Sequence, residues 1–147
     1  AKEYSAAFII ASAAFSSFFF TLLFGGTVLD ALCALVIGGI LRAAIRLLGK
    51  STVNNFFVSL CAGSAASIMT DILGITPIPL HSSVVIIGVL MQVVPGLALV
   101  NAIRDSIAGD FVAGTSRLVD ALLTALALSV GGTAGLFVTH AIQGGVQ

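Results

Sequence analysis

The residues best suited to chemistry in this 147-residue chain lie between Val94 and Arg117. Asn101 and Asp105 are four residues apart, so a helix through them places both side chains on one face. A carboxamide and a carboxylate are costly inside an apolar segment unless they face a water-filled cavity or a polar partner. The pair is therefore a candidate binding site for a polar solute or for a proton.

Pro95 and Gly96 precede this pair and predict a break in the helix that carries it. Proline has no N–H group and clashes with the preceding turn, and glycine loosens the turn further. A half-helix that begins near Leu97 would leave N–H groups unpaired and present the positive end of its dipole, which suits a carboxylate. The alternative is an ordinary proline kink whose freed backbone groups are satisfied by a neighbouring serine or threonine.

Four more charged residues in and just after this segment have both a functional and a structural interpretation. Arg104 is either an anchor at the membrane interface or a counter-charge for a substrate. Asp110 can cap the next helix or pair with Arg117, which also stands three residues from Asp120. These last three residues form either a structural ion-pair group or a part of the binding and coupling site.

A second group of titratable residues, expected on the outer side, consists of Asp30, Asp71, His81 and His140. Histidine titrates near neutral pH, so a ring of these residues could pass protons inward. The simpler interpretation is that each of them lies at a polar boundary of the fold. Their spacing forms no metal-binding motif, and no cofactor is expected.

The composition indicates whether these residues are positioned by a protein that folds in water or in a lipid bilayer. Hydrophobic residues make up 59% of the chain and charged residues 8%, and the mean hydropathy is +1.19. Such a chain cannot cover a water-facing surface, so lipid is the expected solvent. The formal net charge of +0 and the lack of a basic stripe exclude nucleic-acid binding. Cys33 and Cys61 lie in apolar runs and are expected to be small buried hydrophobes rather than a disulfide pair.

Long gaps between charges predict an all-α integral membrane bundle of five transmembrane helices in a single domain. A span needs roughly 20 mostly apolar residues. The first apolar run is too long for a signal peptide, and no soluble domain follows it. Glycine, proline and polar residues separate the expected helices, which are residues 5–24, 27–48, 54–74, 83–104 and 115–140.

The positive charges predict an orientation with the N-terminus in the cytoplasm. Lysine and arginine are retained on the cytoplasmic side of membrane proteins. Five crossings place all six of them inside: Lys2, Arg42, Arg46, Lys50, Arg104 and Arg117. A re-entrant hairpin at Pro95 and Gly96 would move Arg104 and Arg117 outside. The charges therefore favour a full fourth crossing that contains a break.

Small residues at helical spacing predict the contact faces, because helices in lipid associate by close packing. The third expected helix carries Ala62, Gly63, Ala66 and Ser67, and the fifth carries Ala121, Ala125, Ser129 and Thr133 together with Gly131 and Gly135. The first helix instead carries bulky rings at all angles, which suits lipid or a partner subunit: Phe15, Phe18, Phe19, Phe20 and Phe24.

From Pro95 to Arg117 the sequence resembles the threonine/serine exporter family, in its split, two-subunit type that also includes dicarboxylate exporters. The matching pattern is Pro-Gly, Asn, Asp, Gly-Asp, Gly and Arg, at Pro95, Gly96, Asn101, Asp105, Gly109, Asp110, Gly114 and Arg117. The resemblance implies a location in the bacterial cytoplasmic membrane. It also implies a preceding cytoplasmic domain, which is expected to be absent from this chain.

The resemblance further implies a partner, a second five-span module that is either fused or a separate subunit. An odd number of crossings gives two such modules inverted topology, the arrangement that supports alternating access. The alternative assembly is a homo-oligomer of this chain.

The leading hypothesis is an exporter module for small hydroxy amino acids or dicarboxylates, coupled to protons. Substrate would bind at Pro95 and Gly96, Asn101 would supply hydrogen bonds, and Asp105 would bind the amino group or the coupling proton. A passive pore and a non-transporting assembly subunit are the alternatives. An enzyme is not expected, because Asp71 and Asp105 are predicted near opposite faces of the bilayer and cannot form an aspartyl dyad.

Overall fold

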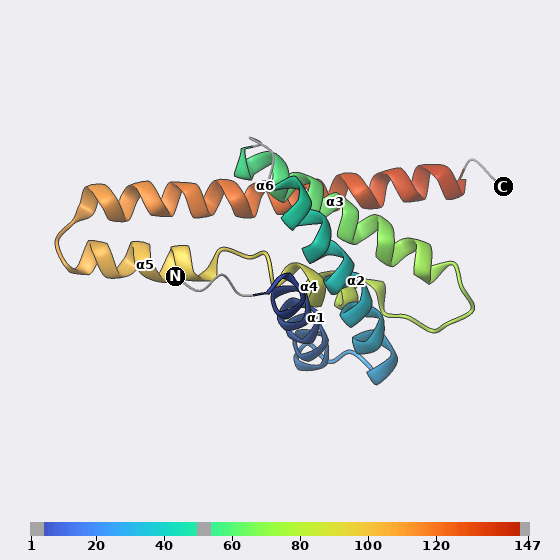
Figure 1. The fold of residues 1–147 in the computed structure, drawn as a ribbon. Coiled ribbons are helices and arrows are strands. Elements are labelled where there is room, and N and C mark those ends of the chain that lie inside the picture. Colours follow the sequence, from blue (N-terminus) through green and yellow to red (C-terminus); the bar gives the residue numbers. More distant parts are fainter. Residues whose placement is uncertain (1–4, 50–53, 145–147) are drawn as a thin grey trace.

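The computed structural model describes residues 5–49 and 54–144. Its described part contains six helices and is shown in Figure 1. In chain order they are α1 (Ala6–Leu23), α2 (Val28–Leu48), α3 (Asn55–Gly74), α4 (Ser82–Leu90), α5 (Gly96–Ile107) and α6 (Phe111–Gly144). Lys2 and Lys50, two of the six positive charges that predict the orientation in the membrane, lie outside the described residues.

The first three helices begin and end within one residue of the expected 5–24, 27–48 and 54–74 because local signals mark their ends. Gly25 has a φ of 83° in the turn after α1, a conformation that glycine adopts without strain. Thr27 and Asp30 form a reciprocal capping box at the start of α2. The Asn54 side chain accepts a hydrogen bond from the N–H of Phe56 and starts α3.

The expected fourth span, residues 83–104, corresponds to two short helices rather than to one. α4 has 9 residues and α5 has 12, and residues 91–95 connect them. The described part of the chain has four helices that are long and apolar enough to cross a membrane: α1, α2, α3 and α6. The five-span count, the single broken fourth crossing and the orientation therefore stay predictions.

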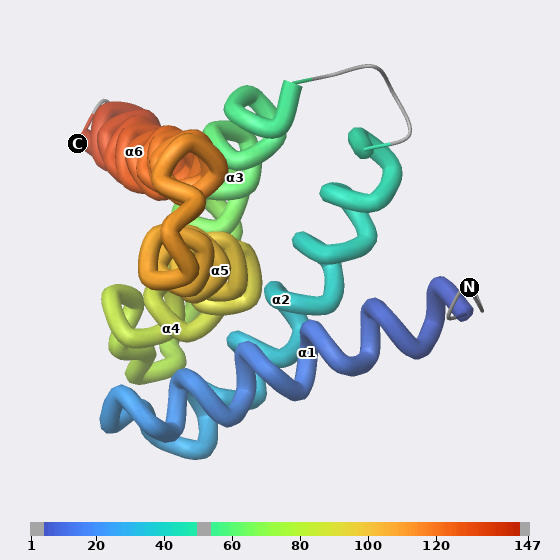
Figure 2. Tube along the Cα trace, turned by 90° about the vertical axis from the view of Figure 1, so that its left-hand side faces the viewer, coloured from blue at the N-terminus to red at the C-terminus, as the bar shows by residue number. Residues whose placement is uncertain are grey.

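α6 is longer than the expected 115–140 and organises one side of the molecule. Its 34 residues correspond to about 51 Å, against about 30 Å for the hydrocarbon core of a bilayer. Figures 1 and 2 show α5 lying beside the first part of α6, while α3 packs against its later part. The other side of the molecule is formed by α1 and α2, with α4 packed against α1, α2 and α3.

The interior is small and largely apolar, with a few buried hydroxyl groups and Asp30, and much of the outer surface is apolar as well. The largest fully buried apolar side chains are Ile37 and Leu41 of α2 and Val85 and Val89 of α4. Exposed large hydrophobic residues occur on all six helices, as expected for a protein whose helices face lipid. Phe15, Phe19 and Phe24 are exposed, whereas Phe18 and Phe20 are half-buried.

Glycine allows the backbones of α3 and α6 to approach each other closely. A Cβ atom on Gly131 would overlap the carbonyl oxygen of Leu60, and one on Gly135 would lie 2.7 Å from the carbonyl oxygen of Ser64. A Cβ atom on Gly63 of α3 would likewise overlap the carbonyl oxygen of Leu128 on α6. The predicted packing role of Gly131 and Gly135 is thus confirmed, as is burial of the predicted face of α3, which consists of Ala62, Gly63, Ala66 and Ser67.

The other predicted stripe of α6 is wrong beyond its first residue. Ala121 is buried, but Ala125, Ser129 and Thr133 are exposed. Successive helical residues are separated by about 100°, so Ser129 and Gly131 lie about 200° apart around the axis and only one of them can face α3. The helix turns its glycines inward because they permit the closer approach. The expectation for cysteine is also corrected: Cys33 is half-buried and Cys61, on the outer side of α3, is exposed.

Candidate functional site

The motif residues that follow Asp105 build the turn between α5 and α6. Gly109 has a φ of 92°, and its N–H donates to the carbonyl of Ser106 while the N–H of Asp110 donates to the carbonyl of Asp105. These two bonds form a Schellman motif, which ends a helix at a glycine in the left-handed conformation. The Asp110 carboxylate then accepts a hydrogen bond from the N–H of Ala113 at 3.1 Å and caps α6.

Gly114 and the Asp105–Arg117 pair hold the two helices of this hairpin together. A Cβ atom on Gly114 would lie 2.9 Å from the carbonyl oxygen of Ala102 and would overlap the hydroxyl of Ser106. Arg117 Nε lies 3.0 Å from Asp105 Oδ2. Because α5 and α6 run antiparallel from a tight turn, the last turn of α5 faces the second turn of α6.

The pairing of Arg117 with Asp105 corrects the expected pairing with Asp110 or Asp120. Asp110 is occupied as a helix cap, and Asp120 is exposed and makes no side-chain ion pair within the described ranges. Arg104 is also exposed, and residues 5–49 and 54–144 supply it with no ion-pair partner. The hairpin therefore carries five charged side chains, and only two of them, Asp105 and Arg117, form an ion pair in the part of the chain that the structure describes.

The start of α5 keeps some of its N–H groups unpaired. Pro95 is the residue before the helix, and the N–H of Gly96 donates to the carbonyl of Val94 at 2.8 Å. The N–H groups of Leu97 and Ala98 find no acceptor in the part of the chain that the structure describes. Leu97 is 82% exposed, so this helix end lies at the surface of the chain rather than inside it.

Asn101 and Asp105 are both half-buried on α5, but they do not line the apolar pocket on the hairpin. The Asn101 carboxamide forms no hydrogen bond with another described residue. The pocket, of about 320 Å³, is lined instead by Ala102, Ile103, Ser106, Ile107, Phe111, Gly114 and Leu118.

The second titratable group divides into two pairs. Asp30 is fully buried at the start of α2, and one of its carboxylate oxygens accepts hydrogen bonds from the N–H and hydroxyl of Thr27 at 2.8 and 2.9 Å. The same oxygen lies 2.9 Å from Nδ1 of His81, and the other oxygen accepts the N–H of His81 at 3.0 Å. The His81 side chain is 65% exposed, so Asp30 ties the start of α4 to the start of α2 from beneath the surface.

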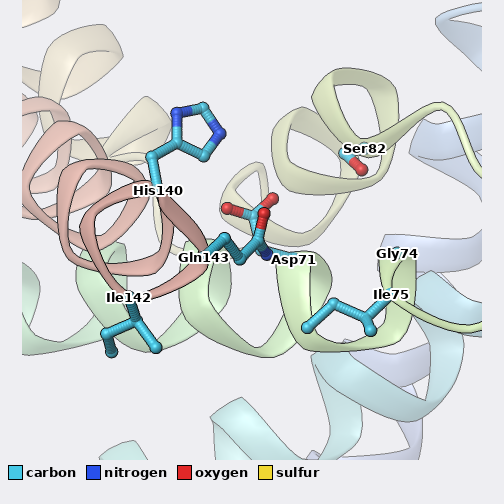
Figure 3. A pocket seen from close by; sticks show the side chains of 7 residues that line it. All are labelled: Asp71, Gly74, Ile75, Ser82, His140, Ile142 and Gln143. Carbon is cyan, nitrogen blue, oxygen red and sulfur yellow. The ribbon is translucent and has the colours of Figure 1, made fainter. Parts of the chain in front are cut away.

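Asp71 and His140 share a different place, a pocket of about 640 Å³ at the ends of α3 and α6 (Figure 3). The hydroxyl of Thr139 donates to the Asp71 carboxylate, which links the two helices. Ser82, the residue after His81, also lines this pocket, whose full lining is Asp71, Gly74, Ile75, Ser82, His140, Ile142 and Gln143. No cluster of three metal-binding side chains occurs among the described residues.

Gln92 is a polar contact that sequence reasoning missed. It lies in the connection between α4 and α5, and its Nε2 donates to the carbonyl of Gly38 at 3.1 Å and to the hydroxyl of Ser17 at 3.3 Å. It thus fastens this connection to both α1 and α2. A signal was present, because Gln92 is the single carboxamide side chain between Asn55 and Asn101.

Comparison with known proteins identifies one family. The model of the family described as "Putative threonine/serine exporter" matches residues 1–139. No curated protein and no solved structure matches the chain. The family consists of membrane transporters rather than enzymes, in agreement with the four long apolar helices.

Proposed function

Because this chain belongs to the threonine/serine exporter family, we propose that it exports small hydroxy amino acids or dicarboxylates in exchange for protons. It is an integral membrane protein of a transport family. The proposal adds the substrate classes, the coupling ion and a location in the bacterial cytoplasmic membrane. The observation that carries it is the interruption of the helical bundle between α4 and α5.

The interruption places polar groups within an apolar region. Residues 91–95 are not helical, and they bring Gln92 against α1 and α2 while Pro95 precedes the unpaired N–H groups of Leu97 and Ala98. Irregular backbone at membrane depth is tolerated where it lines a cavity or is covered by protein. Transporters use such interruptions to bind charged substrates, so the α4–α5 connection is the proposed substrate region.

The Asp105–Arg117 pair is the proposed coupling element. Protonation of the Asp105 carboxylate removes its charge and with it the attraction to Arg117. The two helices of the hairpin would then keep the close contact at Gly114, the apolar side chains between them and the turn, but no ion pair. Proton binding would in this way change how α5 sits on α6, and α5 carries the substrate region at its other end.

A second five-span module of inverted topology is the proposed partner. This chain leaves the start of α5 at its surface, with Leu97 and Val100 mostly exposed. A substrate bound there needs a wall on the other side, which the second module would supply. In the proposed orientation the N-terminus of this chain is cytoplasmic.

Transport measurements in proteoliposomes test the proposal, with the chain reconstituted together with any module that co-purifies. We expect an imposed pH gradient to drive accumulation of threonine and serine, or of succinate. Asp105→Asn should abolish the response to the gradient, whereas Asp120→Asn, which removes an exposed carboxylate outside the ion pair, should retain it. Flux that ignores the gradient in the wild-type protein would identify a passive facilitator instead. No flux of any of the three solutes would reject the proposal.

A further inference from the structure

A polar pocket lies between α1, α2 and the α4–α5 connection. It has a volume of about 220 Å³ and is lined by residues of α1, α2 and the connection: Ile9, Ser12, Ala13, Ser16, Arg42 and Gln92. Pockets for drug-sized ligands measure about 300–1,000 Å³, so this one suits a molecule with few heavy atoms.

Arg42 supplies the charge of this pocket. It is half-buried in α2, a helix apolar enough to span a membrane, and it is the single charged residue of the lining. No acidic side chain among the described residues pairs with it. An arginine in such a segment is stabilised when an anion meets its guanidinium, which binds carboxylates through paired N–H groups.

Gln92 supplies an unused acceptor. Its amide nitrogen is held by the carbonyl of Gly38 and the hydroxyl of Ser17, so the orientation of the side chain is determined. Its Oε1 is buried and has no hydrogen-bond partner. A buried acceptor without a partner costs free energy, and a ligand N–H or O–H group that reaches it when the lining side chains move would remove that cost.

We infer that this pocket binds a small zwitterionic amino acid, with its carboxylate on Arg42 and its ammonium group on Gln92. Ser12 and Ser16 line the same pocket, and the Ser12 hydroxyl donates to the carbonyl of Ile9. The inference rests on the proposed function and goes beyond it, because it adds a pocket between α1, α2 and the connection to the exposed start of α5. It also orders the substrates: succinate has no ammonium group for Gln92 and should bind more weakly than threonine.

Binding of radiolabelled threonine to the purified protein provides the first test. Arg42→Gln should weaken binding at least tenfold and Arg42→Lys less than that. The matched control is Arg46→Gln, which removes the same charge one turn further along α2 but does not line the pocket; it should change binding less than twofold. Ethanolamine, which lacks the carboxylate, should compete poorly in the wild-type protein.

Reagent selectivity provides a second test, in which the charge of the pocket is measured without the substrate. Ser12→Cys is introduced after Cys33→Ala and Cys61→Ala remove both native thiols. The negatively charged sulfonatoethyl methanethiosulfonate should label the new thiol at least threefold faster than the positively charged trimethylammonium reagent. Arg42→Gln should abolish this preference and Arg46→Gln should keep it, and threonine should slow the labelling.

The outcomes separate the inference from the proposed function. Wild-type affinity for threonine in Arg42→Gln overturns the inference even where transport is intact. A charge preference that depends on Arg42 without binding of threonine or serine shows an anion-selective pocket but overturns the inference that it binds these amino acids, and a lack of succinate binding as well rejects the proposed substrates. Labelling with no charge preference overturns the inference whatever the transport result.

Discussion

Arg117 Nε lies 3.0 Å from Asp105 Oδ2, and this ion pair joins the last turn of α5 to the second turn of α6. The Arg117 side chain is 54% exposed and the Asp105 side chain 28%, so solvent reaches the pair, although Oδ2 itself is buried and accepts no hydrogen bond. Ion pairs of this kind contribute less than about 1 kcal/mol to stability. The proposed coupling role requires only that such a pair can open and close.

Exchanging the two charges tests whether the pair itself is needed. Asp105→Arg and Arg117→Asp should each reduce proton-driven transport strongly, because each leaves two like charges facing each other across the hairpin. The double variant restores the pair in reverse and should recover a part of the transport rate. The temperature of unfolding in detergent should differ little between the wild-type protein and the double variant. A double variant as inactive as the single ones, though equally stable, would contradict the coupling role of the pair.

Gly131→Ala should destabilise the protein, because its new Cβ atom would overlap the carbonyl oxygen of Leu60 on α3. Overpacking of a tight contact costs about 1–3 kcal/mol. The neighbouring Gly132→Ala is the control: its Cβ atom would lie 3.5 Å from Ser67 Oγ, an ordinary contact. Unfolding followed by circular dichroism during titration with a denaturing detergent measures both. Equal stability of the two variants would show that α3 and α6 are not packed through Gly131.

Gly109→Ala should strain the turn of the hairpin, since the φ of 92° is unfavourable for residues with a Cβ atom. The expected loss is about 1–2 kcal/mol. Gly96→Ala provides the contrast, because no atom lies within 4 Å of the position of its Cβ atom and its φ is not positive. We expect Gly96→Ala to keep the stability of the wild-type protein while reducing transport, if substrate approaches the backbone there. A loss of stability in Gly96→Ala but not in Gly109→Ala would contradict the structural role given to Gly109 and the substrate-contact role given to Gly96.

Asp30→Asn should destabilise the end of the molecule where α2 and α4 begin. The carboxylate is fully buried and accepts hydrogen bonds from Thr27 and His81, and hydrogen bonds to charged groups are worth about 1.5–3 kcal/mol. His81→Ala removes only the exposed ring and keeps the backbone N–H bond, so its cost should be smaller. The same detergent titration distinguishes them. A larger loss in His81→Ala than in Asp30→Asn would contradict the central role of the carboxylate.

The first three helices could be predicted from the sequence because their ends carry local signals. Gly25, Thr27 and Asn54 stop or start a helix through their own conformations and side chains, without reference to the rest of the fold. The stretch from residue 83 to residue 104 has no comparable signal for its path. Pro95 and Gly96 indicate that a helix is interrupted, but a chain can continue or turn after an interruption, and hydropathy is similar in both cases.

The contacts of the candidate site depend on relative positions that a single sequence does not contain. Asp105 meets Arg117 only because α5 and α6 have one particular register, which the turn at Gly109 determines. Thr139 reaches Asp71 across 68 positions of the chain. Asn101 and Asp105 could be recognised as unusual by their types, whereas their roles stay predictions. The pocket at Arg42 and Gln92 joins three segments and could not be assembled from spacing at all.

The link between Asp30 and His81 has a consequence for biosynthesis. The two residues are separated by 51 positions, so a growing chain that has released the first helical pair still lacks two of the donors for that carboxylate. Until the later segment emerges from the ribosome, the acid must rely on Thr27 and on water. The complete set of hydrogen bonds to the Asp30 carboxylate therefore forms only when the beginning of α4 has been synthesised.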